Sequence, residues 1–254
     1  MTTYAFRTRG HVLVERNLLV YRHAWMTIFS GFFEPLFYLF SIGLGLGHFV
    51  GRIHGVSYAS YIAPALLASS AMNGAINDAM TNVFWKLRYM KLYESVLTTP
   101  LGPGDVAVGE TAWAQFRGAL YALGFVVIAA SLGLFHSWWA ILALPAAMVV
   151  GFSFAGMGIG ASTFIRTWQD LDFAQLVQLP MFLFSATFYP LSVYPAVIQW
   201  LVRCSPLYHA SALIRSLTLG TVGPMNLLNV GYLLLLGGIG IAVARRRMAG
   251  LLLT

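Results

Sequence analysis

The chain alternates between long apolar stretches and short polar connections over most of its length. A helix needs roughly 20 apolar residues to cross the hydrocarbon core of a bilayer, so we expect about six membrane-spanning helices. The first apolar stretch follows a basic N-terminus, but it is too long for the core of a signal peptide, which predicts a retained span. The six stretches cover residues 24–50, 57–85, 111–134, 138–165, 173–189 and 225–244.

Residues 184–220 break this pattern, because they are apolar yet interrupted by Pro190, Pro195 and Pro206. Proline ends or kinks a helix, and the pieces between these prolines are too short to cross a bilayer. Backbone that is broken at membrane depth must be buried in protein or line a cavity. We therefore expect residues 190–220 to form short re-entrant helices, an arrangement more typical of transport proteins than of membrane anchors.

The composition supports a membrane protein with little room for a soluble domain. Of 254 residues, 59% are hydrophobic and 9% are charged, whereas soluble domains carry about 25% charged residues. We therefore expect an all-α integral membrane protein with one domain over residues 1–254. Residues 2–22 hold several arginines in a weakly amphipathic pattern, which favours a helix at the membrane interface; a solvated tail is the alternative.

The positions of the basic residues indicate how the chain is oriented in the membrane. If both termini are cytoplasmic, eleven of the fifteen Lys and Arg residues fall in inner segments and three in outer ones, while Arg117 lies within the third span. Cytoplasmic segments carry an excess of basic residues. We therefore expect residues 184–220 on the outer side. This distribution accounts for the net charge of +7 without a nucleic-acid partner.

The sequence contains no motif for ATP hydrolysis or for metal binding. A phosphate-binding loop requires a lysine after glycine, but Lys86 and Lys91 follow Trp85 and Met90. Any ATPase that energises this protein is therefore a separate chain. The histidines lack the close spacing of a zinc site. Cys204 is the only cysteine, so we expect no metal and no intrachain disulfide.

The inner loop after the second span predicts a short cytoplasmic helix over residues 86–99. Its apolar and aromatic side chains fall on one helical face and its polar side chains on the other. Proline and glycine residues from Pro100 onward then end the helix. A solvated connector is the alternative, but aromatic side chains are enriched in interface cores. We therefore expect this helix to dock on a partner.

Three segments resemble the ABC type-2 permease family. YESVLTTPLGPGDVAVGE at residues 93–110 is similar to the signature loop of that family, and residues 186–215 are similar to its second signature. EPLFYLFSIGLGLG at residues 34–47 resembles its first span. The three matches occur in the expected order, and the branch that they resemble is that of the nodulation-protein J and daunorubicin-resistance permeases.

The resemblance implies a permease subunit of an ATP-driven exporter in the bacterial inner membrane. Its substrate would be hydrophobic or amphipathic: a drug, a lipid, a glycolipid or a lipo-oligosaccharide. Two ABC ATPase subunits would hold ATP and Mg, leaving no cofactor on this chain, and a second permease, identical or paralogous, would complete the membrane core. In this family the helix between spans two and three couples the ATPase to the spans, and the N-terminal helix also contacts the ATPase. The implied coupling residues are Arg88, Tyr89, Lys91, Tyr93 and Glu94.

Charged and aromatic residues within the spans are candidates for the translocation path. Ionisable groups inside a membrane are functional candidates by default. Glu34 lies about 15 Å into the first span, where it either lines a path or is paired structurally. Arg117 is a possible partner of Glu34 or of Asp78, and core packing explains the aromatic and methionine side chains equally well. The candidate path residues are Glu34, Phe37, Asp78, Met181, Phe184 and Tyr189.

Two other functions remain open from the residues alone. Ser153 lies in a glycine-rich stretch that resembles the nucleophile motif of intramembrane serine proteases, with His209 as the only plausible base. Small residues in a span also permit close helix packing, which explains the same stretch without catalysis. A secondary transporter is the other alternative, but such proteins usually show inverted repeats or more intramembrane charge, and this sequence shows neither.

Overall fold

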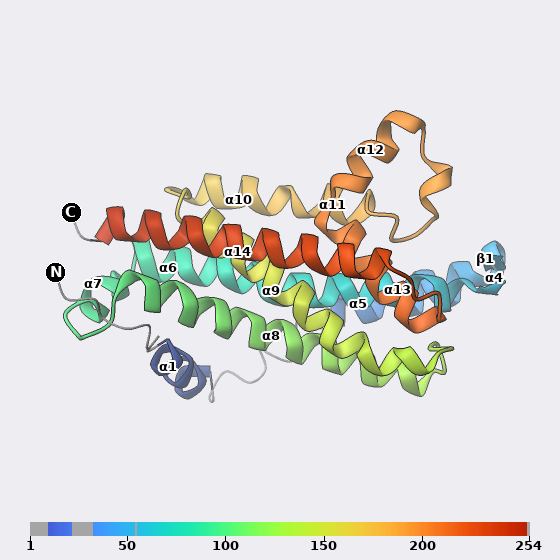
Figure 1. Cartoon of the computed structure of the whole chain (residues 1–254), viewed down its shortest axis with the longest axis horizontal. Helices are drawn as coiled ribbons and strands as arrows, with labels where there is room; N and C mark the ends of the chain where they lie inside the picture. The colour runs from blue at the N-terminus through green and yellow to red at the C-terminus, as the bar shows by residue number, and fades with distance from the viewer. Residues whose placement is uncertain (1–9, 22–32, 54, 253–254) are drawn as a thin grey trace.

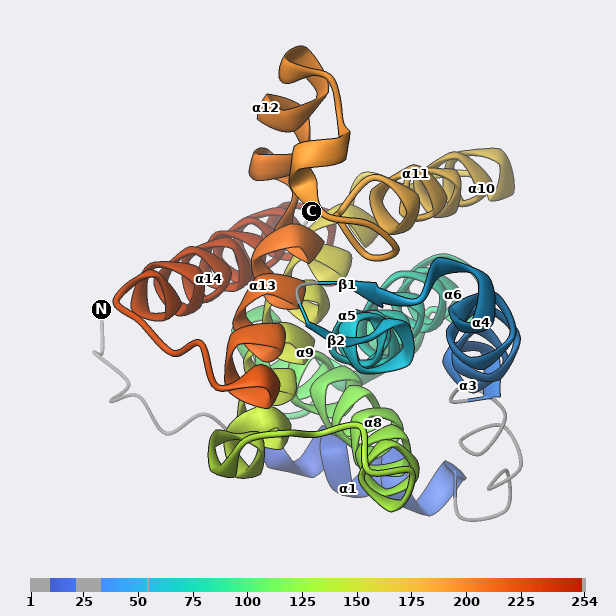
Figure 2. The same cartoon turned by 90° about the vertical axis from the view of Figure 1, so that its right-hand side faces the viewer.

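The computed structural model describes residues 10–21, 33–53 and 55–252, and its long helices form a bundle along one axis (Figure 1). Helix α5 (Tyr58–Asn77) is the most deeply buried element, with nearly all of its side chains inside the protein. The helices α8 (Pro103–Ser131), α9 (Ala143–Ser162) and α13 (Pro206–Leu219) pack around it (Figure 2). This confirms the expected, mostly helical fold.

The first two expected spans are helical wherever the structure describes them, apart from Ser57, which belongs to a short strand. The first consists of α3 (Phe33–Tyr38), the π-helical η1 (Leu39–Leu46) and α4 (Gly47–Val50), while residues 24–32 lie outside the described ranges. A short hairpin of β1 (Arg52–Ile53) and β2 (Val56–Ser57) leads to the second span. That span runs without a break through α5, η2 (Asp78–Asn82) and α6 (Val83–Arg88).

Three helices among the described residues are long and apolar enough to cross a membrane, and they correspond to the third, fourth and sixth expected spans. They are α8, the segment Trp138–Ser162 that joins η3 (Trp138–Leu142) to α9, and α14 (Met225–Leu252). Helix α8 begins earlier than expected, at Pro103, because proline suits a first helical position and the Asp105 carboxylate accepts the Gly102 N–H. Helix α14 continues past the three arginines at residues 245–247.

The fifth expected span is shorter than predicted and divided. It consists of α10 (Trp168–Leu176) and α11 (Gln178–Leu183), separated at Val177. Pro180 has no N–H to donate to the carbonyl of Leu176, and its ring crowds that carbonyl, so the helix is interrupted one turn before the proline. The expected continuation from Phe184 to Tyr189 is not helical.

The proline-broken segment forms short helices as predicted. Pro190 and Pro195 directly precede η4 (Leu191–Val193) and α12 (Ala196–Cys204), and Pro206 is the first residue of α13. Helix α12 projects away from the bundle (Figure 2) and leaves its apolar side chains Val197 and Trp200 exposed. Each of these helices is too short to cross a bilayer.

The two helices expected near the cytoplasm are both present, with changed bounds. Helix α1 (His11–Tyr21) packs on the N-terminal part of α8, and residues 2–9 of the expected helix lie outside the described ranges. The single helix expected over residues 86–99 is divided, because α6 ends at Arg88 and α7 (Leu92–Val96) starts after a turn. Lys91 causes this break with a left-handed backbone conformation, φ 47°.

Helices α9 and α14 approach each other closely through glycine. A Cβ atom on Gly156 would overlap the carbonyl oxygen of Gly237, and one on Gly240 would overlap the backbone of Gly156. Small residues let backbones approach in this way, which supplies the packing energy that holds membrane helices together. The glycine-rich stretch around Ser153 is therefore part of a helix contact.

Replacing Gly240 by valine should destabilise the protein, because the added side chain must push α14 away from α9. We expect a loss of about 1–3 kcal/mol, the usual cost of overpacking a filled core. Thermal unfolding of the detergent-purified protein would measure it. Gly238→Val is the matched control, because the space beside Gly238 is open. Equal unfolding temperatures for the two variants would contradict this packing.

Candidate functional site: an amide-lined pocket and its inner boundary

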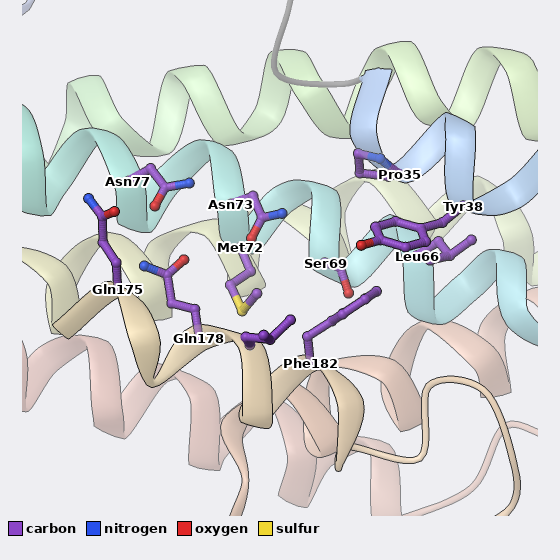
Figure 3. Close-up of a pocket in the computed structure, with 11 residues that line it drawn as sticks. Pro35, Tyr38, Leu66, Ser69, Met72, Asn73, Asn77, Gln175, Gln178 and Phe182 are labelled. Atoms are coloured by element: carbon purple, nitrogen blue, oxygen red, sulfur yellow. The ribbon is translucent and has the colours of Figure 1, made fainter. Parts of the chain in front are cut away.

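A pocket of about 240 Å³ lies between α5 and the α10–α11 pair, next to α3 (Figure 3). From α5, Ser69, Asn73 and Asn77 face it at four-residue spacing, which places them on one side of the helix. Gln175 and Gln178 face it from the opposite wall. Apolar side chains complete the lining: Pro35, Tyr38, Leu66, Met72, Leu179 and Phe182.

The polar groups of this pocket are uncharged and incompletely satisfied. No acidic or basic side chain among the described residues is part of its lining. Gln175 donates from Nε2 to the Thr81 hydroxyl at 3.3 Å. The Nε2 atom of Gln178 is buried, and no acceptor among the described residues reaches it. A buried donor without a partner costs about 1–3 kcal/mol, so the pocket suits a ligand that offers hydroxyl or carbonyl oxygens.

Aromatic contacts lie near both ends of the α10–α11 pair. On the side of α6, the rings of Trp85 and Trp168 lie 5.3 Å apart between centroids. On the side of α3, Tyr38 and Phe182 lie at the same separation, 5.3 Å. The polar pocket thus lies between two aromatic contacts along the same helix pair. Such an arrangement offers both apolar and polar contacts to one amphipathic molecule.

A buried ion pair lies on the side of the second span that faces α8. The Arg117 guanidinium donates to the Asp78 carboxylate at 2.5 Å and to the Tyr121 hydroxyl at 2.8 Å. Arg117 therefore pairs with one of its two expected partners, Asp78. The side chain of the other, Glu34, lies outside the described residues. Asp78 does not line the pocket. Its ion pair with Arg117 therefore gives Asp78 a structural role.

The other path residues expected from the sequence are not part of the pocket lining. Phe37 is exposed on α3, and Met181 is half-buried against the core. Phe184 and Tyr189 are exposed beyond α11, where both rings contact Tyr194. The sequence pattern did not single out the pocket residues Ser69, Gln175 and Gln178. The sequence feature that could have identified these residues is a set of polar side chains at three- and four-residue spacing within otherwise apolar helices.

The expected coupling residues divide into an exposed and an inward-facing set. Tyr89, Lys91 and Glu94 are exposed at the end of the bundle where α7 lies (Figure 1). Arg88 donates from Nε to the Ile165 carbonyl at 3.4 Å, which ties α6 to the α9–α10 loop. Tyr93 is fully buried, so its side chain faces the bundle and not a partner surface.

The structure does not form the serine protease arrangement considered above. Ser153 is fully buried in α9, and its hydroxyl makes no hydrogen bond within the described ranges. Both ring nitrogens of His209 are engaged elsewhere, with Asn229 Oδ1 at 2.8 Å and the Arg203 carbonyl at 2.9 Å. His209, the base expected from the sequence, is therefore not positioned to activate Ser153.

The apolar helix bundle, its broken segment and its uncharged pocket define a polytopic membrane transport protein. The family model for ABC-2 type transporters matches residues 9–219, so the chain belongs to this family. Nodulation protein J of Rhizobium leguminosarum bv. viciae is 34% identical, over 92% of this chain and 93% of that protein. Nodulation protein J of Rhizobium leguminosarum bv. trifolii is 36% identical, over 81% and 79%. The inner membrane transport permease YadH of Escherichia coli K12 is 26% identical, over 68% and 67%.

Membership of this family confirms the resemblance seen in the sequence. The chain is a permease subunit of an ABC exporter, a multi-pass protein of the inner membrane. It is not an enzyme, because permeases of this family pair with a separate ABC ATPase that hydrolyses ATP. Such permease subunits carry no cofactor of their own.

Replacing Arg117 by methionine should destabilise the permease, because it leaves the buried Asp78 charge without its partner. Removing one member of a buried pair costs about 3–5 kcal/mol. We expect a lower unfolding temperature in detergent, and partial recovery when Asp78→Leu is added. Arg203→Met, at an exposed arginine of α12, should change little. An Arg117→Met protein as stable as the parent would show that the pair is dispensable.

Proposed function

We propose that this permease exports amphipathic molecules whose polar part is uncharged, and that this part binds in the amide-lined pocket between spans two and five. The observation that carries the proposal is the buried, unpartnered Nε2 donor of Gln178, which faces a cavity lined by further amides.

The chemistry of the lining favours a sugar-like group over a charged one. Side-chain amides both donate and accept hydrogen bonds, as the hydroxyl and acetamido groups of a glycan require. A phosphate or ammonium group would instead need a countercharge, and no described residue of the lining supplies one. The apolar rim at Tyr38, Leu179 and Phe182 suits an attached hydrocarbon chain. Among the substrates implied by the sequence, a glycolipid or lipo-oligosaccharide fits best.

In the proposed topology the chain crosses the membrane six times with both termini in the cytoplasm. Helix α7 and the C-terminal end of α14 lie at one end of the bundle, and the β1–β2 hairpin lies at the other (Figure 1). The end with α7 carries the basic residues Arg88, Lys91 and Arg245–Arg247, which supports a cytoplasmic position. The broken segment around α12 would then lie toward the outer face.

The proposed assembly contains two permeases and two ATPase subunits, with the second permease identical or paralogous. The ATPase would contact the exposed side of α7 at Lys91 and Glu94, together with Tyr89. Closure of the ATPase pair would then move the inner end of the second span. Because that span forms one wall of the pocket, its tilt would change the pocket and release substrate outward.

Replacing Gln178 by methionine and Asn73 by leucine should lower export of a glycolipid that carries a short fluorescent acyl chain. Each lost hydrogen bond is worth about 0.5–1.5 kcal/mol, so the double variant should raise the apparent KM about tenfold. ATP-dependent uptake into inverted membrane vesicles measures this effect. The control is Gln169→Met, at an exposed amide on α10 outside the pocket. Unchanged KM in the double variant would exclude this pocket as the binding site.

Reversing the charge at Glu94 should weaken binding of the ATPase. We expect about tenfold less ATPase co-purified in mild detergent, since losing one favourable interfacial charge contact of about 1.4 kcal/mol has that effect. Glu94→Lys should leave the unfolding temperature of the permease itself unchanged, because the side chain is exposed. Arg203→Glu, at the exposed end of α12, serves as the control. Full ATPase recovery with Glu94→Lys would exclude this side of α7 as the contact.

A further inference from the structure

A second buried ion pair lies where the inner end of span two meets the start of span three. The Lys86 ammonium in α6 donates to both carboxylate oxygens of Glu110 in α8, at 2.8 and 2.9 Å. Both side chains are almost completely buried, at 6% and 1% exposure. Burying two charges is costly unless their geometry and hydrogen bonds are well satisfied, and here one ammonium spans both oxygens.

Helix α1 contributes a third polar member to this pair. Asn17 accepts a hydrogen bond from Lys86 Nζ at 3.1 Å and donates to Glu110 Oε2 at 3.3 Å. Gly10, Leu13 and Asn17 lie on one face of the α1 segment and are all buried. A Cβ on Gly109 would come within 2.7 Å of the Gly10 carbonyl oxygen. Helix α1 is therefore fastened to α8 at two consecutive residues, Gly109 and Glu110.

Helix α7 reaches the same place through Tyr93. Burial, and then the negative charge of Glu110, raises the pKa of the Tyr93 phenol well above its usual value. The phenol therefore remains neutral beside the ion pair and adds no third charge. Its ring is fully enclosed, so Tyr93 anchors α7 to the inner ends of the spans.

This anchorage matters because α7 is poorly suited to pass on force through its own chain. It has five residues, and an isolated helix of that length is unstable in water. The left-handed Lys91 turn separates it from α6, and residues 97–102 separate it from α8. A push on α7 must therefore reach the spans through side-chain contacts, and Tyr93 is the side chain of α7 that is fully enclosed.

We propose that Lys86, Glu110 and Asn17, with Tyr93 packed against them, form a transmission junction. The junction makes α1, α7 and the inner ends of spans two and three move as one unit. This inference rests on the proposed action of the ATPase on α7. Lys86 and Glu110 are positioning residues, because they act through the helices and touch neither ATPase nor substrate.

The decisive experiment separates coupling from assembly. The permease is co-purified with its ATPase and reconstituted in liposomes, and the measured quantity is the amount of fluorescent short-chain glycolipid transported per ATP hydrolysed. In Glu110→Gln and in Lys86→Gln this ratio should fall at least about fivefold, the lower end of usual coupling energies. The amount of bound ATPase should remain unchanged. The exchange variant Lys86→Glu with Glu110→Lys should recover most of the ratio, because it restores the pair.

Glu15→Gln is the matched control, because Glu15 is an exposed acid on the same helix as Asn17. It should transport like the parent protein. Asn17→Ala removes no charge, so it tests the junction even if a charge variant does not assemble, and it should also lower the ratio. A parental ratio in assembled Glu110→Gln, or in Asn17→Ala, would overturn the proposal.

A distance measurement tests the junction without any transport assay. In a Cys204→Ser background, spin labels at Leu19 of α1 and Ser95 of α7 both occupy exposed positions. Their distance distribution should stay narrow when ATP and vanadate trap the ATPase, and it should broaden in Glu110→Gln. Unchanged distributions in both proteins would overturn the junction. Absence of ATP-driven transport in the parent protein would refute the proposed function, while the distance measurement would still decide the junction.

Discussion

Close packing around α5 is the constraint on which the rest of this structure depends. Lipid tails are as apolar as the side chains they surround, so membrane helices are held together by packing and polar contacts. Helix α5 is enclosed by α8, α9 and α13, and α9 is in turn locked to α14 through Gly156 and Gly240. This tight group leaves α10 and α11 at the margin of the bundle (Figure 2). The pocket forms at the boundary between the tightly packed part and the loosely packed part.

The buried charged side chains are held by partners within the protein, whereas one amide donor at the pocket is not. The acids Asp78 and Glu110 are each paired with a basic side chain. Arg215 donates to the carbonyls of Tyr61 and Ala186 and lies over the Tyr61 ring. These ionised groups therefore have partners supplied by the protein itself. The buried Nε2 donor of Gln178 at the pocket has no such partner among the described residues, which makes the pocket a better candidate for substrate contact than the charged residues.

The sequence predicted the helices well, because span length and proline position act locally. The short helices that start after Pro190 and Pro195 follow from such local rules. The rarity of charge in spans marked Arg117 for pairing, but it left Glu34 and Asp78 open as partners. The interruption caused by Pro180 was equally local, but the apolar composition of that stretch concealed it. A search for short helices at every proline would have found it.

Features that depend on tertiary contacts could not be predicted in this way. Lys86 and Glu110 stand at the two ends of a polar loop, so the sequence pattern places them in solvent. Only the approach of α6, α8 and α1 buries them together. Tyr93 lies on an amphipathic face that suits a partner as well as the bundle, and the pattern alone cannot decide between the two. The sequence pattern does not reveal the pocket face of α10–α11 for the same reason. An exposed glutamine and a pocket-lining glutamine cannot be told apart in the sequence.

The second span connects these sites mechanically. It is continuous from Tyr58 to Arg88, a length of about 45 Å at 1.5 Å per residue. Its C-terminal end carries Lys86, its middle lines the pocket with Asn73, and Arg215 of α13 donates to the Tyr61 carbonyl near its N-terminal end. Arg215 also binds the Ala186 carbonyl just beyond α11. A tilt of this one helix would therefore move both the pocket wall and the anchor of the proline-broken segment, so force applied near α7 has a continuous path to the opposite end of the bundle.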